Sequence, residues 1–139
     1  MKSNKKTTKM DAKVLLSTLW IFVMFNYVYA DIMGLMDPGL LNQFLTGTIN
    51  GINLTQSFLF WAAVLMEIPI AMVLLSRVLK YRTNRLANIA AGSIKTLVMI
   101  ASMFVGSGPT LYYMFFGSIE IVTTAYIVWY AWNWRNSEA

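Results

Sequence analysis

Three ionisable residues lie alone in the middle of apolar segments, and this pattern is the strongest indication of chemistry in the chain. They are Glu67, Lys95 and Glu120, each about ten residues from either end of a stretch long enough to cross a bilayer. At a rise of about 1.5 Å per residue, all three are expected near the membrane midplane. A charge at that depth costs about 2.5–3.5 kcal/mol on insertion scales, so these residues point to a functional site.

The charges of these three residues do not balance. Fully ionised, two carboxylates and one ammonium carry a net charge of −1. Lys95 can neutralise one carboxylate, which leaves the other to be protonated, hydrogen-bonded or matched by a cation that the chain does not encode. The group therefore suits a proton or a small cationic amine, in transport or sensing. The alternative is a structural or accessory membrane subunit, in which buried charges fix helix packing and the choice of partner.

The residues one turn from each charge indicate which helix face carries it. Ala91 and Gly92 precede Lys95, and Gly117 precedes Glu120. Small residues are typical of places where membrane helices approach closely. We therefore expect all three charges, Glu67 included, to face the interior of a helix bundle.

Other polar residues are expected to join this interior site. Asn26 and Asp31, from the first apolar segment, are candidate ligand- or proton-binding residues, although Asp31 could equally be a solvated helix end. Pro69 has no N–H to offer the carbonyl oxygen of Leu65, so a free acceptor is expected near Glu67. The expected supporting residues are Pro69, Tyr27, Ser102, Thr123 and Thr124.

Composition excludes several classes of protein. The chain has 139 residues, of which 58% are hydrophobic and 12% are charged, and this balance indicates an integral membrane protein. It has no Cys and no His, so thiol nucleophiles, disulfides and imidazole ligands are absent. We expect no metal and no cofactor. An intramembrane enzyme using Glu67 or Glu120 as a general acid is a third hypothesis, which the lack of any nucleophile motif disfavours.

The hydrophobic pattern predicts an all-α polytopic four-helix bundle that forms a single membrane domain, residues 1–139. The expected spans are approximately 14–32, 57–79, 86–105 and 110–132, with an outer cap at 33–56. Basic residues precede the first span, flank the second connection and follow the fourth span, whereas the other two connections have none. They are Lys2, Lys5, Lys6, Lys9, Lys13, Arg77, Lys80, Arg82, Arg85 and Arg135. The positive-inside rule then predicts that both termini are cytoplasmic. Because the net charge of +5 follows this topology, it does not indicate nucleic-acid binding.

The outer cap has local signals of its own. Asp37 and Pro38 form an N-cap followed by proline at the first helical position, and Gly47 predicts a helix end. Asn50 and Gly51 then predict a tight hairpin turn. We expect a short interfacial helix and a hairpin over the outer mouth of the bundle, the alternative being a simple connector.

Two runs of sequence carry a resemblance to known proteins. Residues 31–39 (DIMGLMDPG) and 65–82 (LMEIPIAMVLLSRVLKYR) resemble an uncharacterised family of small bacterial four-helix membrane proteins, loosely similar in plan to DoxX-like proteins. The resemblance covers about residues 13–134. It implies a compact bundle in the bacterial inner membrane, and it assigns neither an activity nor site residues. Because four helices are few for a transport path within one subunit, transport would require a homodimer.

Overall fold

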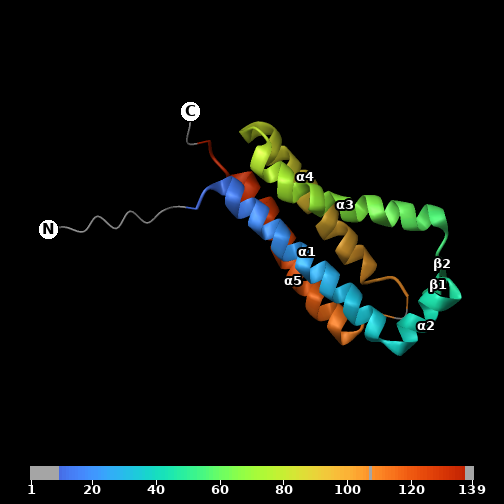
Figure 1. Ribbon diagram of the computed structural model, residues 1–139. Helices are drawn as coiled ribbons and strands as arrows, with labels where there is room; N and C mark the ends of the chain where they lie inside the picture. Colours follow the sequence, from blue (N-terminus) through green and yellow to red (C-terminus); the bar gives the residue numbers. More distant parts are fainter. Residues whose placement is uncertain (1–9, 107, 137–139) are drawn as a thin grey trace.

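The computed structural model describes residues 10–106 and 108–136, which form five helices and one small hairpin (Figure 1). The elements follow in the order α1 (Ala12–Met36), α2 (Pro38–Thr46), β1 (Thr48–Ile49), β2 (Ile52–Asn53), α3 (Gln56–Val78), α4 (Tyr81–Ser102) and α5 (Leu111–Asn133). The predicted all-α class is confirmed. The basic residues at positions 2, 5, 6 and 9, on which part of the predicted orientation depends, lie outside the described residues.

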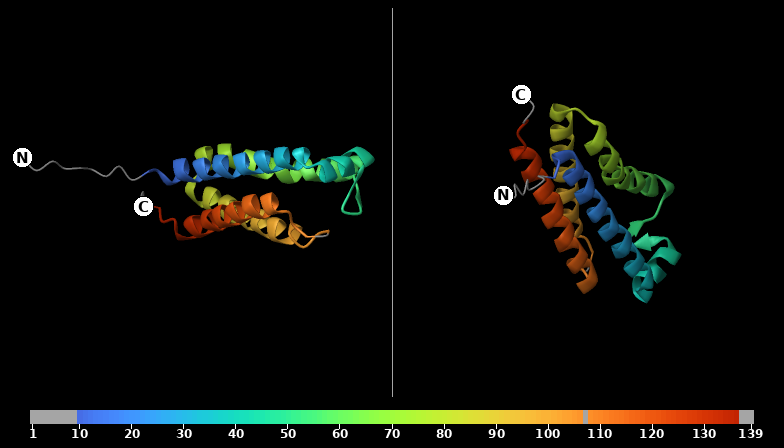
Figure 2. Two further views of the ribbon diagram at one scale, coloured as in Figure 1. Left: turned by 90° about the horizontal axis from the view of Figure 1, so that it is seen from below. Right: turned by 60° about the vertical axis from the view of Figure 1, so that its left-hand side comes forward.

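Three of the helices, α1, α3 and α5, are long and apolar enough to cross a membrane. The chain is therefore a multi-pass membrane protein by length and composition. α4 coincides with the third predicted span but is less apolar than the other three, because it carries Arg82 and Arg85 in its first turns and Lys95 in its middle. It nevertheless runs beside α5 along most of its length (Figures 1 and 2).

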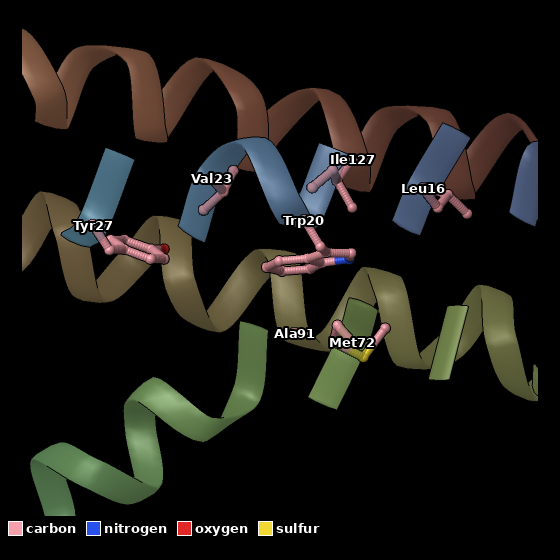
Figure 3. Packing of buried hydrophobic residues seen from close by; sticks show 7 residues of the cluster. All are labelled: Leu16, Trp20, Val23, Tyr27, Met72, Ala91 and Ile127. Carbon is pink, nitrogen blue, oxygen red and sulfur yellow. The ribbon is translucent and has the colours of Figure 1, made fainter. Parts of the chain in front are cut away.

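The four long helices form two layers. α1 packs against α3, and α4 packs against α5, while α1 also contacts α5 across the layers (Figure 2). The core lies on one face of α1, where Leu16, Trp20, Val23 and Tyr27 recur at helical spacing and are buried (Figure 3). The other helices meet this face with single buried side chains: Met72 of α3, Ala91 of α4 and Ile127 of α5.

α3 contacts the bundle mainly through its C-terminal half. Its buried residues are Pro69, Met72 and Ser76, whereas no residue of its first half is buried. That half leaves the other helices towards the hairpin (Figure 1). An apolar surface on the N-terminal half of α3 is therefore left without a neighbouring helix.

Glycine brings α4 and α5 close together. A methyl group built on Gly92 would lie 2.7 Å from Cγ2 of Val128 and 3.2 Å from the carbonyl oxygen of Thr124. One on Gly117 would collide with the methyl group of Met99. A hydrogen bond of 2.7 Å between the hydroxyls of Thr96 and Thr124 fixes the register of the two helices. This close contact positions the midplane residues of α4 and α5 against each other.

The local signals in residues 33–56 predicted the structure of the cap. Asp37 caps α2 by accepting hydrogen bonds from the backbone N–H groups of Gly39 and Leu40, at 3.0 and 3.4 Å. Gly47 ends the helix in the left-handed conformation, with φ of 78°. Asn50 and Gly51 form the hairpin turn, with φ of 49° and 81°. The predicted helix and hairpin are confirmed.

Candidate functional site

Lys95 and Glu120 come together inside the bundle, as predicted. Lys95 on α4 is 2% exposed and Glu120 on α5 is 6% exposed. The Nζ atom of Lys95 lies 4.2 Å from the centroid of the Tyr27 ring, which α1 contributes. That distance is typical of a cation–π contact, which holds an ammonium by attraction to the negative face of an aromatic ring. The stripes of small residues on α4 and α5 thus identified the interior faces correctly.

These residues line one side of a pocket of about 150 Å³ between the four long helices. Polar groups from three helices meet in it: Asp31 and Tyr27 of α1, Lys95 and Ser102 of α4, and Glu120 and Tyr113 of α5. The rest of its wall is apolar and includes Leu65 and Met66 of α3, Val98, Met99 and Phe116. A few converging polar groups in an apolar pocket are typical of small-molecule sites.

Asp31 takes the place in this site that the sequence suggested for Glu67. Asp31 lines the pocket but, unlike Lys95 and Glu120, it is an exposed residue. Asp31 and Glu120 both interact electrostatically with Lys95. Two carboxylates and one ammonium again give a net charge of −1 when all three are ionised. The net charge of −1 predicted for the interior site therefore also applies to the pocket, with Asp31 in place of Glu67.

Tyr27 carries an unpaired polar atom into the site. The residue is 8% exposed, and its buried hydroxyl makes no hydrogen bond of ordinary geometry, although the Glu120 carboxyl is close enough to act on it both as a charge and as a hydrogen-bond acceptor. Figure 3 shows this hydroxyl at the end of the buried row of α1. A buried hydroxyl without a partner costs roughly 1–3 kcal/mol. The wall of the pocket thus includes a polar group that makes no hydrogen bond of ordinary geometry.

The predicted supporting residues fall into two groups. Ser102 lines the pocket, and its hydroxyl lies 2.7 Å from that of Tyr113. Thr123 and Thr124 are buried beside Glu120, but their hydroxyls donate to the carbonyl oxygens of Ile119 and Glu120 at 2.7 and 2.9 Å. Both hydroxyls are therefore satisfied by the backbone of α5, that of Thr124 also contacts Thr96 of α4, and neither threonine lines the pocket.

Two predicted site residues and one supporting residue lie elsewhere. Glu67 is exposed on α3 and does not line the pocket, so the expectation that it faces the interior is wrong for the single chain. Pro69, two residues further along α3, is buried. Because proline has no N–H, the carbonyl oxygen of the pocket residue Leu65 lacks its usual helical donor. Asn26 is half-buried, and its amide donates to the carbonyl oxygen of Phe22 at 2.9 Å.

A second buried polar cluster was not predicted from the sequence. The indole N–H of Trp20 donates to Oδ1 of Asn88 at 2.8 Å, and the hydroxyl of Ser76 donates to the same oxygen at 3.3 Å. The amide of Asn88 donates in turn to Oδ1 of Asn84 at 2.7 Å, and the amide of Asn84 donates to the carbonyl oxygen of Ser76 at 2.7 Å. The spacing of Asn84, Asn88 and Lys95 on one face of α4 was the available signal.

The carboxylates do not form a metal site. Within residues 10–106 and 108–136, no group of three or more Asp or Glu side chains is placed so that it could hold a metal ion. Two carboxylates beside an ammonium are a poor match for Ca²⁺ or Mg²⁺, which need six or more oxygen ligands. The arrangement suits an organic cation or a proton better.

Comparison with known proteins places the chain in a family. A model described as "Family of unknown function (DUF6326)" matches residues 5–139. The chain belongs to this family. No curated protein and no solved structure matches the chain. The match confirms the predicted membership of an uncharacterised family. The similarity in plan to DoxX-like proteins and the bacterial origin stay predictions.

Proposed function

We propose that this DUF6326 member is an integral membrane protein whose interior pocket binds a proton or a small cationic amine. The observation that carries the proposal is the convergence of Lys95, Glu120 and Asp31 on one pocket with a net charge of −1. A bound cation would neutralise that charge. The burial of Lys95 and Glu120 supports this proposal, because unmatched charge is costly away from water.

The proposed setting is a membrane transporter or sensor. All four long helices would span the membrane, with both termini on the cytoplasmic side and the α2–hairpin cap outside, as the distribution of Lys and Arg favours. A bacterial inner membrane is the proposed location. For transport, two copies would associate, and proton exchange at a carboxylate of the pocket would be the coupling step.

Binding of small amines to purified protein at several pH values tests the proposal. Methylamine should bind more tightly as pH rises, because protons and the amine compete for the same carboxylates while the amine itself stays charged. Glu120→Gln and Asp31→Asn should weaken binding and reduce its dependence on pH. Glu67→Gln is the matched control: it removes a midplane carboxylate outside the pocket and should leave binding unchanged. Equal binding in all four proteins would contradict the proposal.

The second candidate is a structural or accessory subunit. The buried cluster around Asn88 favours it, because four side chains from three helices are fully enclosed and satisfied there without lining the pocket. Buried polar groups of this kind fix which helices pair. In this case the buried charges would also hold the helices together. Either single change, Lys95→Glu or Glu120→Lys, should then disrupt the fold, and the double variant with both changes should restore it.

A further inference from the structure

We infer that the ligand of the pocket is a primary or secondary organic amine with an apolar group, whose ammonium binds at Tyr27 in the place that the Lys95 ammonium now covers. The inference rests on the proposed function and makes it specific in two ways. It names the chemical class of the ligand, and it makes Lys95 an internal competitor of the ligand.

The contact between Lys95 and Tyr27 shows that this part of the pocket accepts a cation. The ammonium lies 4.2 Å from the ring centroid, and Glu120 and Asp31 act on it from their own positions. An aromatic face with nearby carboxylates is the chemistry by which proteins recognise ligand ammonium groups. In the structure, the Lys95 ammonium is thus the cation that occupies this position.

The volume and the wall of the pocket define the rest of the ligand. A cavity of about 150 Å³ lined by apolar side chains is large enough for a benzene ring. The apolar part of the wall includes Leu65, Met66, Val98 and Phe116. A bare metal ion or methylammonium would leave this wall without contacts. An amine with a single ring or a short branched chain matches both the volume and the wall.

The free hydroxyl of Tyr27 adds a requirement for N–H groups. This oxygen is buried and makes no hydrogen bond of ordinary geometry, and the Glu120 carboxyl is its neighbour. An ammonium N–H at the rim of the ring can donate to it while the charge stays near Glu120. A quaternary ammonium has no N–H to donate, and a neutral alcohol would leave the negative charge unmatched. Both considerations favour a protonated amine that keeps an N–H, and a primary or secondary ammonium has at least two, one for the hydroxyl and one for a carboxylate.

The Lys95 ammonium must leave the face of the Tyr27 ring when such a ligand binds. One ring face holds one cation, and two ammonium groups in contact repel each other. The lysine side chain has four flexible carbon atoms, and the backbone around it is bordered by Ala91 and Gly92. Its ammonium can move towards a carboxylate while the ligand occupies the ring. Removing the lysine charge should therefore strengthen binding, the opposite of what a ligand-binding lysine would show.

Binding of benzylamine, measured by calorimetry on the full chain in detergent, tests this inference. Benzyl alcohol and benzoate serve as neutral and anionic comparators of the same size. We expect Lys95→Met to strengthen benzylamine binding by about tenfold or more, and Lys95→Arg, which keeps a cation on the ring, not to strengthen it. Tyr27→Leu should weaken binding by about tenfold, and Tyr27→Phe by roughly threefold to tenfold, because it removes the hydroxyl alone.

The outcomes separate the inference from the proposed function. If Glu120→Gln abolishes benzylamine binding but Lys95→Met weakens it or leaves it unchanged, the function stands and the inference is wrong. Preferred binding of benzoate that is lost in Lys95→Met would overturn both, as would absence of amine binding in every variant. The retained helicity and monodispersity of each variant, measured in parallel, show that lost binding does not come from lost folding.

Discussion

The Lys95 ammonium is held against the ring of Tyr27, with 4.2 Å between Nζ and the ring centroid, in the interior of a membrane protein. This contact joins α4 to α1, whereas Glu120 approaches the same ammonium from α5. Three helices thus share one buried charge. An aromatic face is weaker than a carboxylate as a partner for an ammonium, and the two carboxylates of the pocket exceed its one ammonium by one negative charge.

The Asn88 side chain is predicted to be a main determinant of stability. Replacing it with Ala removes the acceptor of the Trp20 indole and of the Ser76 hydroxyl and a donor to Asn84. Each buried group left without a partner costs roughly 1–3 kcal/mol, so we expect a loss of several kcal/mol in the free energy of unfolding. Unfolding by denaturant in mixed micelles measures it.

Asn133→Ala is the matched control for Asn88→Ala. Its amide donates only within α5, to the carbonyl oxygen of Trp129 at 2.9 Å, and the residue is exposed. We expect a change within about 0.5 kcal/mol. Similar losses for both variants would show that the buried cluster has no special role in holding α1, α3 and α4 together.

Gly92 is predicted to be intolerant of any side chain. The methyl group of Gly92→Ala would meet the side chain of Val128 at 2.7 Å and the backbone of Thr124 at 3.2 Å, so α4 and α5 would have to move apart. Overpacking of this kind costs typically about 1–3 kcal/mol. We expect a lowered melting temperature and weaker amine binding. In Gly39→Ala the new methyl group would meet Asp37 at an ordinary 3.4 Å, and that variant should melt as the wild type does.

Local signals in the sequence were sufficient for the elements and for the burial of Lys95 and Glu120. The cap of α2 and its hairpin turn depend on neighbouring residues, so Asp37, Gly47 and Asn50 could be interpreted directly. The interior faces of α4 and α5 followed from residues one turn from Lys95 and Glu120, because both helices are packed over their full length.

Features that depend on tertiary arrangement could not be predicted in this way. Glu67 was assigned to the interior by the same rule, which fails on α3: Leu65 and Met66 line the pocket and Pro69 is buried, whereas Glu67 is exposed. Trp20 and Asn88 are 68 residues apart, and only the packing of α1 on α4 brings them together. For the same reason, the sequence could not show that Asp31 lines the pocket and that Glu67 does not.

The proposed orientation can be measured with single cysteines, since the chain has none of its own. Asn42→Cys lies in α2 and Thr110→Cys precedes α5, whereas Arg82→Cys begins α4 and Arg135→Cys follows α5. In intact cells, we expect a membrane-impermeant maleimide to label the first pair but not the second, and permeabilisation to expose all four. Labelling of Arg82→Cys together with Thr110→Cys in intact cells would show that α4 does not cross the membrane.

The exposed position of Glu67 leads to a prediction about association. A carboxyl group on the apolar surface of α3 is costly in lipid, and a second copy of the chain would remove it from lipid and allow two carboxyl groups to share hydrogen bonds. Ala63→Cys, one turn away on the same exposed face, should then form disulfide-linked dimers in membranes under mild oxidation. Adding Glu67→Leu should lower that yield several-fold while leaving amine binding by the pocket unchanged. Val122→Cys, which is 68% exposed on α5, is the control for random collisions. If Ala63→Cys crosslinks no better than Val122→Cys, α3 faces lipid and the two-copy arrangement proposed for transport does not use this surface.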